Sequence, residues 1–215
     1  MKDKYILTAE SVTAGHPDKL CDTIADSILD ACLKEDPNAR VACEVLATAG
    51  KILVAGELRT TANPDVEAIV RQVVRNAGYD CNYHVEVRLH TQSPDIAGAV
   101  DGDTLGAGDQ GIMYGYACWE TVELLPAPVV LANRITSLLT TCREEKLISG
   151  IGPDGKAQVS VQYAFGVPER VDTIVISCQH DADKDPDKLR EELRRLVIAR
   201  ACHDCLLYTS PSPRD

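Results

Sequence analysis

Five residues near the N-terminus, Gly15–Lys19 (GHPDK), combine side chains suited to binding a phosphate chain. They follow a short apolar run, Tyr5–Ala9, and precede a helical pattern, so we expect them at a helix N-terminus, where free N–H groups favour anions. Pro17 suits the first helical position. Asp18 beside a polyphosphate is tolerable only with a divalent cation between them. The motif predicts metal–nucleotide chemistry, although His16 or Asp18 alone would be ordinary for a helix start.

Two carboxylates, Glu44 and Glu57, each interrupt an apolar run in a predicted strand. A carboxylate within a half-buried strand is costly unless it binds a cation. The alternative is simple alternation, with both side chains facing solvent. The sequence leaves both interpretations open.

The run Gly106–Gly111 matches the dinucleotide fingerprint GxGxxG. That fingerprint needs an apolar strand before it and a helix after it. Here the polar run Asp101–Leu105 precedes it, a β-like run follows, and Asp109 would direct a carboxylate at the pyrophosphate, so we reject the dinucleotide interpretation. The long stretch of small residues before it suits a lid. Gly152–Lys156 is at minimum a turn, and its lysine could reach a phosphate.

The periodicity of the chain predicts a mixed α/β (α+β) fold built from a repeated βαββαβ unit. The first repeat has strands at 4–10, 40–47, 51–59 and 84–90, and helices at 17–34 and between Pro64 and Gly78. The second has strands at 111–118, 156–165 and 171–179, and helices at 128–146 and 186–203. Its last strand is missing, so we expect the second unit to be incomplete.

Composition excludes several classes of protein. The 215 residues are 45% hydrophobic, enough for a packed core. A net charge of −11 argues against a nucleic-acid binder. The sequence lacks a long apolar stretch and a signal-peptide pattern, so we expect a cytoplasmic protein without membrane contacts. Most of the nine cysteines lie singly in apolar patterns, typical of free thiols.

The last residues, Cys205–Asp215, differ in composition from the rest and are similar to a translated sequencing-library adapter. We interpret this segment as a non-native tail, the alternative being a disordered Ser/Pro-rich tail. The run Cys202–Cys205 (CHDC) is therefore not interpreted as a metal or redox site, since a lone CxxC is a weak signal.

Together these motifs resemble the S-adenosylmethionine synthetase (methionine adenosyltransferase) family. The matching segments occur in the family's order and cover nearly everything from Lys4 to His203. They are Glu10–Lys19, Asp36–Glu44, Gly56–Glu57, Gln92–Ile96, Gly106–Gly111, Pro126–Pro128, Asp154–Lys156 and Gln179–His180.

The resemblance implies three similar α/β units, of which the third is absent here, and a homodimer or dimer of dimers with active sites between subunits. It implies that ATP and L-methionine form S-adenosylmethionine, and that the released tripolyphosphate is cleaved to diphosphate and phosphate, with Mg²⁺ and K⁺ assisting. The expected domains are residues 1–102, residues 103–204, which are truncated, and the tail 205–215.

The resemblance also implies roles for individual residues. Catalysis falls to His16, which donates near the bridging oxygen of the leaving group, and ATP contacts to His16, Asp154 and Lys156. Methionine contacts fall to Glu57, Gln92 and Asp109, with Gln92–Gly102 as the gating loop. Asp18 would hold Mg²⁺ and Glu44 would hold K⁺.

Two departures from the family pattern matter. The segment before the gating loop is short, and the later Gly-rich and Lys/Arg-bearing segments are absent. We therefore expect this chain alone to be inactive. The alternatives are a non-catalytic interaction subunit of a full-length synthetase, or a metal-dependent phosphohydrolase.

Overall fold

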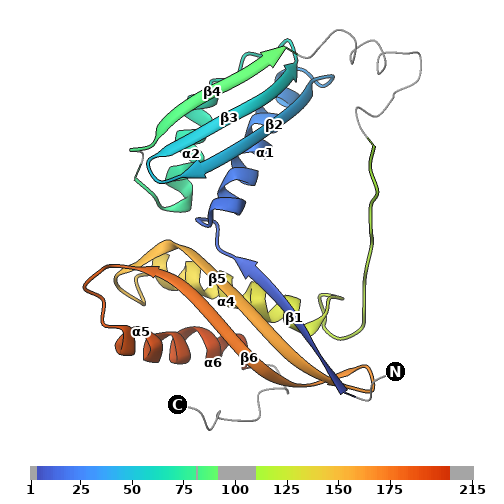
Figure 1. The fold of residues 1–215 in the computed structure, drawn as a ribbon, viewed down its shortest axis with the longest axis vertical. Coiled ribbons are helices and arrows are strands. Elements are labelled where there is room, and N and C mark those ends of the chain that lie inside the picture. The colour runs from blue at the N-terminus through green and yellow to red at the C-terminus, as the bar shows by residue number, and fades with distance from the viewer. Residues whose placement is uncertain (1–3, 81, 92–109, 204–215) are drawn as a thin grey trace. The chain divides into compact units, whose positions relative to one another are not determined.

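The computed structural model describes residues 4–80, 82–91 and 110–203. These residues fall into two compact units. The first unit is formed by residues 17–115, and the second combines residues 1–16 with residues 116–215. Each unit is one β-sheet with its helices on one face, as Figure 1 shows for each unit separately.

The first unit contains α1 (Pro17–Glu35), β2 (Arg40–Thr48), β3 (Lys51–Arg59), α2 (Val66–Ala77) and β4 (His84–Thr91). Its sheet has the order β2-β3-β4, with β2 antiparallel and β4 parallel to β3. The strands predicted at 40–47 and 51–59 are confirmed as β2 and β3, and Gly50 supplies the positive φ of 72° that the turn between them requires. The predicted stop of α2 is also confirmed, because Gly78 adopts the left-handed conformation as its C-cap.

The core of the first unit lies between its helices and its sheet. On α1 the buried residues recur every four positions, which places them on one helix face: Leu20, Ile24, Ile28 and Cys32. They pack with Val70, Val73, Val74 and Ala77 of α2 and with Ile52 and Val54 of β3. The acidic residues of α1 between them, Asp22, Asp26 and Asp30, are exposed to solvent.

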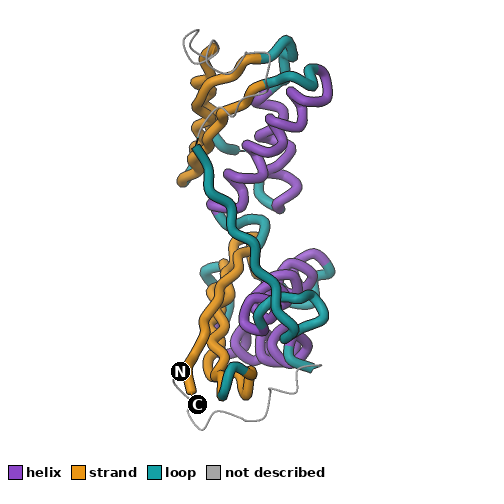
Figure 2. Tube along the Cα trace, turned by 90° about the vertical axis from the view of Figure 1, so that its right-hand side faces the viewer, coloured by secondary structure: helices purple, strands orange, loops and turns teal. Residues whose placement is uncertain are grey.

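The second unit contains β1 (Lys4–Val12), α4 (Ala127–Glu144), β5 (Ile151–Ala164), β6 (Val167–His180), α5 (Pro186–Leu193), the π-helical turn η1 (Arg194–Ile198) and α6 (Ala199–Ala201). Its sheet has the order β1-β5-β6, and both pairings are antiparallel. Figure 2 shows that, in each unit taken separately, the strands form one layer with the helices on one side.

The pairing of β1 differs from the predicted repeat. The sequence pattern places this strand with the first repeat, but it pairs along nine residues with β5 of the second, from Lys4–Ala164 to Val12–Lys156. Tyr5 stacks on the buried ring of Tyr163 with their centroids 5.2 Å apart. The sheet of the first unit therefore lacks the leading strand of the predicted repeat.

The predicted strand at 111–118 is wrong. Residues 110–118 are described but form no regular structure, and the apolar side chains of Ile112, Tyr114 and Tyr116 are exposed. A strand needs a neighbour for its backbone N–H and C=O groups. The edge of β5 that a self-contained repeat would offer this segment is occupied by β1.

The start of α4 is tied to β5 by one carboxylate. Glu120 accepts a hydrogen bond from the Ala127 N–H at 2.9 Å and another from the Tyr163 hydroxyl. A negative charge at a helix N-terminus is favourable, and it satisfies an N–H group that Pro126 cannot cap. Burial and the Glu120 carboxylate together raise the pKa of Tyr163, so its hydroxyl stays a donor.

We expect Ile24→Ala to lower the free energy of unfolding by about 2–5 kcal/mol, because it opens a cavity in the core of the first unit, where Ile24 is fully buried. Urea unfolding followed by circular dichroism measures this. Leu46→Ala, at a position that is 60% exposed, is the matched control and should change stability little. Equal midpoints for the two variants would contradict this description of the core.

Candidate functional site

In the second unit, the end of β1 lies against the start of β5, which carries Asp154 and Lys156. The turn predicted at Gly152–Lys156 is wrong, because these residues belong to β5 itself. The Thr13 N–H donates to the Gly155 carbonyl at 2.9 Å, and the Thr13 hydroxyl donates to the Pro153 carbonyl at 2.7 Å. A Cβ on Gly15 would lie 2.5 Å from that Pro153 oxygen, so only glycine allows this close approach. Pairing of β1 with β5 thus brings together two motifs that lie about 140 residues apart in the chain.

His16 follows this contact directly. It is half-buried, and its backbone N–H donates to the Thr13 carbonyl at 3.1 Å, which closes a turn at the end of β1. The second unit therefore holds His16, Asp154 and Lys156, the three residues with predicted ATP contacts.

Lys156 lies on the face of the sheet that the helices do not cover. Its ammonium forms an ion pair with Glu10 at 2.8 Å, and the two side chains are 40% and 54% exposed. Exposed pairs of this kind contribute little to stability. An anionic ligand could therefore displace Glu10 at a modest free-energy cost.

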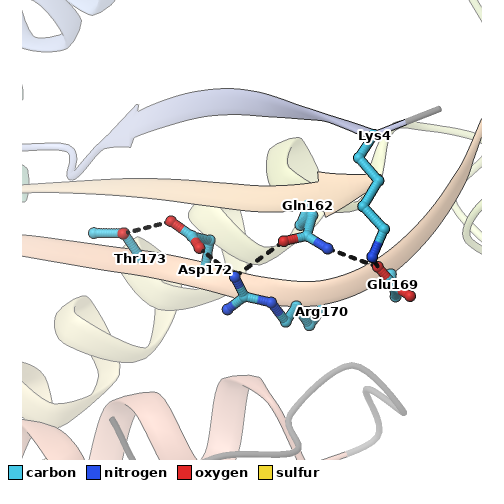
Figure 3. Close-up of polar contacts among 6 residues, drawn as sticks. All are labelled: Lys4, Gln162, Glu169, Arg170, Asp172 and Thr173. Carbon is cyan, nitrogen blue, oxygen red and sulfur yellow. Dashed lines mark hydrogen bonds and ion pairs between the residues drawn. The ribbon is translucent and has the colours of Figure 1, made fainter. Parts of the chain in front are cut away.

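The same face continues as a row of polar side chains toward the far end of the sheet. Gln162 donates to Glu169 and accepts from Arg170, while Lys4 approaches Glu169 at 3.5 Å (Figure 3). Arg170 also binds Asp172 at 2.8 Å. The helix-free face of the second unit is thus mainly polar, unlike its opposite face.

In the first unit, Glu44 and Glu57 lie on the helix-free face of the β2-β3-β4 sheet. Glu44 is opposite Ala55 and Glu57 is opposite Ala42, so the two carboxylates are diagonal neighbours. Their Cα atoms should be about 7–8 Å apart. Both side chains are exposed, as simple alternation would place them, so the cost of burial gives no argument for a cation here.

A third carboxylate on that sheet, Glu86, behaves differently. Lys51 and Arg88 bind it at 2.5 and 2.8 Å and hold its pKa at about 2. Within the described ranges neither Glu44 nor Glu57 has such an ion pair. Their charges therefore remain available to a cation or an ammonium group.

Asp18 is exposed in the first turn of α1. No group of three His, Cys, Asp or Glu residues that could hold a metal ion occurs among residues 4–80, 82–91 and 110–203. A single exposed carboxylate fits Mg²⁺ that arrives bound to phosphates, since this ion is commonly held by one or two carboxylates plus substrate oxygens. Glu44 alone would supply one ligand to K⁺, and further ligands would have to come from elsewhere.

Two predicted methionine contacts, Gln92 and Asp109, lie outside the described residues, as do the gating loop and the tail 205–215. Two open grooves in the second unit, of about 490 and 410 Å³, contain none of the predicted site residues. Asp154 instead borders a space of only about 10 Å³ beside Thr13, so the start of β5 is tightly packed there. No described helix is both long and apolar enough to cross a membrane.

The sequence alone does not identify the two residues that hold the Asp154 segment of β5 in place. Gln179 is recognisable only as part of a matching motif, yet its side-chain oxygen accepts the Asp154 N–H at 3.1 Å. Thr13 carries no signal, since a threonine after a strand is unremarkable in sequence. Only the non-local pairings of β5 give these two residues their contacts.

Two family models match the chain: the S-adenosylmethionine synthetase N-terminal domain over residues 4–102, and the central domain over residues 104–212. Curated proteins named S-adenosylmethionine synthase are similar over most of the chain. The protein from Nitratiruptor sp. is 48% identical over all of this chain and 60% of its own length. Those from Prochlorococcus marinus and Finegoldia magna are 46% and 43% identical, over 90% and 94% of this chain. The chain spans 52% and 56% of their lengths, so it covers little more than half of such relatives.

The thiol of Cys178 is sensitive to the charge of Asp154. Burial raises the pKa of Cys178 to about 11, and the nearby Asp154 carboxylate adds to the shift. We expect the rate of iodoacetamide labelling of Cys178 to be half-maximal near pH 11, and Asp154→Asn to move this midpoint to lower pH, because losing a negative charge favours the thiolate.

Mass spectrometry after short labelling pulses measures the profile. Asp172→Asn, elsewhere on β6, is the control and should leave the midpoint unchanged. An unchanged midpoint in Asp154→Asn would show that this carboxylate does not act on the thiol.

Proposed function

The chain belongs to the S-adenosylmethionine synthetase family, and from that premise we propose that it is part of a methionine adenosyltransferase, with ATP and L-methionine as substrates. The observation that carries the proposal is the pairing of β1 with β5, which places the start of the GHPDK motif beside the segment of β5 that carries Asp154 and Lys156. In the sequence the GHPDK motif predicts contacts with phosphate, and Lys156 is a lysine that could reach one.

In the proposed reaction, a sulfur lone pair of methionine forms a bond to the ribose 5′ carbon of ATP. The bond from that carbon to oxygen breaks, and its electron pair leaves with the tripolyphosphate. Water then cleaves the tripolyphosphate to diphosphate and phosphate. Because a thioether is a weak, neutral nucleophile, the rate must come from alignment and from stabilising the charge that develops on the leaving oxygen.

The proposed roles follow from charge and position. His16 donates a hydrogen bond toward the leaving oxygen, and Lys156 exchanges Glu10 for a phosphate oxygen. Asp154, two residues before Lys156 in β5, contacts ATP. Asp18 would hold Mg²⁺ on the phosphates, where the ion supplies positive charge against the leaving group.

The remaining proposed contacts lie on the sheet face of the first unit and in segments outside the described residues. Glu57 and Gln92 hold methionine, Asp109 contacts its ammonium group, and Glu44 contributes a ligand to K⁺. Two neighbouring carboxylates without ion pairs of their own among the described residues suit cationic groups of this kind. The residues from Gln92 to Gly102 act as the gating loop.

The proposal extends to the organisation of the longer protein. We infer domains at residues 1–102 and 103–204, a non-native tail at 205–215, and a homodimer or dimer of dimers in the cytoplasm. Because the chain covers little more than half of its relatives, we further propose that it is inactive alone. The alternative is a non-catalytic subunit that associates with a full-length synthetase.

A chimera tests the function. Residues 1–204 of this chain, followed by the remaining part of the Nitratiruptor synthase, should form S-adenosylmethionine from ATP and methionine with Mg²⁺ and K⁺, whereas the 215-residue chain should not. His16→Ala in the chimera should lower kcat roughly 10²–10³-fold, the cost of removing one donor to a developing negative charge. Chromatographic detection of the product measures both.

His84→Ala, at an exposed position of β4, is the control. A folded but inactive chimera would contradict the proposed activity, and robust turnover by the 215-residue chain would contradict its proposed inactivity. Stable association of the 215-residue chain with the intact Nitratiruptor synthase would support the alternative.

The role of Asp18 makes a separate prediction about magnesium. In the chimera, Asp18→Asn should raise the Mg²⁺ concentration needed for half-maximal activity at least about tenfold, because one metal ligand is lost. Asp22→Asn, one turn further along α1, should leave it unchanged. Titration of initial rates with Mg²⁺ measures the effect, and equal magnesium requirements in the two variants would remove Asp18 from the proposed metal site.

A further inference from the structure

The ladder between β5 and β6 is interrupted beside the proposed nucleotide contacts. Ile151 pairs with His180 and Gly155 pairs with Cys178. Between these two pairs, β5 has three residues and β6 has only one, Gln179. Residues 152–154 therefore bulge out of the sheet. Bulges of this kind redirect side chains, and the backbone groups that they free must find other partners.

From the β6 side, Gln179 supplies one such partner. Its side-chain oxygen accepts the Asp154 N–H at 3.1 Å. A Cβ added to Gly152 would collide with that same oxygen, so the amide group covers the first residue of the bulge. Gly152 does not have a positive φ, so it is this contact rather than the backbone conformation that favours glycine there.

From the β1 side, Thr13 supplies the second partner. Its side chain is nearly buried, with 6% of its surface exposed, and its hydroxyl donates to the Pro153 carbonyl at 2.7 Å. Its backbone N–H donates to the Gly155 carbonyl. The bulge is thus held on both sides, by a side chain of β6 and by the residue that follows β1.

We propose that Gln179 and Thr13 are positioning residues that set the orientation of the Gly152–Asp154 bulge, and thereby the direction in which Asp154 and Lys156 present their side chains to the nucleotide. This inference rests on the proposed function and adds two residues to its site. Neither residue needs to touch the substrate. Each acts through the backbone of the bulge.

The geometry explains why small changes in the bulge matter. Asp154 and Lys156 flank Gly155, which is buried, and a Cβ added there would lie 3.2 Å from the Thr13 methyl group. A rotation of the bulge therefore moves both side chains at once. Binding of ATP should weaken, while binding of methionine, which the proposed function assigns to the other unit, should not.

A double-mutant cycle in the chimera tests this coupling. Gln179→Ala removes the acceptor, and Gly152→Ala displaces it from the other side. Each change should lower kcat/KM for ATP roughly five- to tenfold, the effect expected from one lost hydrogen bond, with KM for methionine unchanged. The double variant should be no worse than Gln179→Ala alone, because the shortened side chain on β6 leaves nothing for the new Cβ to meet.

Gln162→Ala, on the same sheet but far along β5 from the bulge, is the matched control and should retain the parental kinetics. Effects of the two single changes that multiply in the double variant would overturn the shared mechanism. An equal rise of KM for methionine and for ATP would indicate a general structural defect and would also overturn the positioning role.

Amide hydrogen exchange of the 215-residue chain tests the contacts themselves without any activity. The Asp154 N–H should lose protection in Gln179→Ala and keep it in Gln162→Ala. Thr13→Val should increase exchange across the bulge, and Thr13→Ser, which retains the hydroxyl, should restore the protection. Unchanged Asp154 exchange in Gln179→Ala would overturn the inference, whereas an inactive parental chimera would contradict only the proposed function.

Discussion

The antiparallel pairing of β1 with β5 is the interaction on which the rest of the second unit depends. Nine residue pairs join segments separated by about 140–160 positions, and this ladder seats Tyr5 on Tyr163 at one end and Thr13 on the Gly152–Asp154 bulge at the other. The order of the sheet then leaves one face to α4 and the later helices and the other to polar side chains. Without this pairing, His16 would have no fixed relation to Lys156.

The sequence is sufficient wherever structure is local. The four-residue spacing of Leu20, Ile24 and Ile28 predicts the buried face of α1, and Gly50 and Gly78 mark the hairpin turn and the end of α2. Residues 111–118 show where local reasoning fails. Their alternation is typical of a strand, but alternation does not reveal whether a neighbouring strand is present, and β1 occupies the edge in question.

The candidate site is predictable as a set of residue types and less so as a geometry. The motifs identify His16, Asp18 and Lys156 by their chemistry, because charged groups of these kinds serve few purposes together. The register of β2 with β3, which makes Glu44 and Glu57 diagonal neighbours on an exposed face, is not visible in either run alone. Gln179 is equally hidden, since its importance comes from a bulge in the opposite strand.

The distant partner of β1 also has a consequence for synthesis. The ribosome makes β1 first, but β5 is complete only at Ala164, so β1 must wait roughly 8–30 s at usual elongation rates. The first unit, whose strands and helices all lie between Pro17 and Thr91, can fold during that interval. Until β5 emerges, β1 has no partner strand, and its apolar side chains Tyr5, Ile6 and Leu7 stay exposed. We expect chaperones that bind extended apolar segments to act on β1 during this interval.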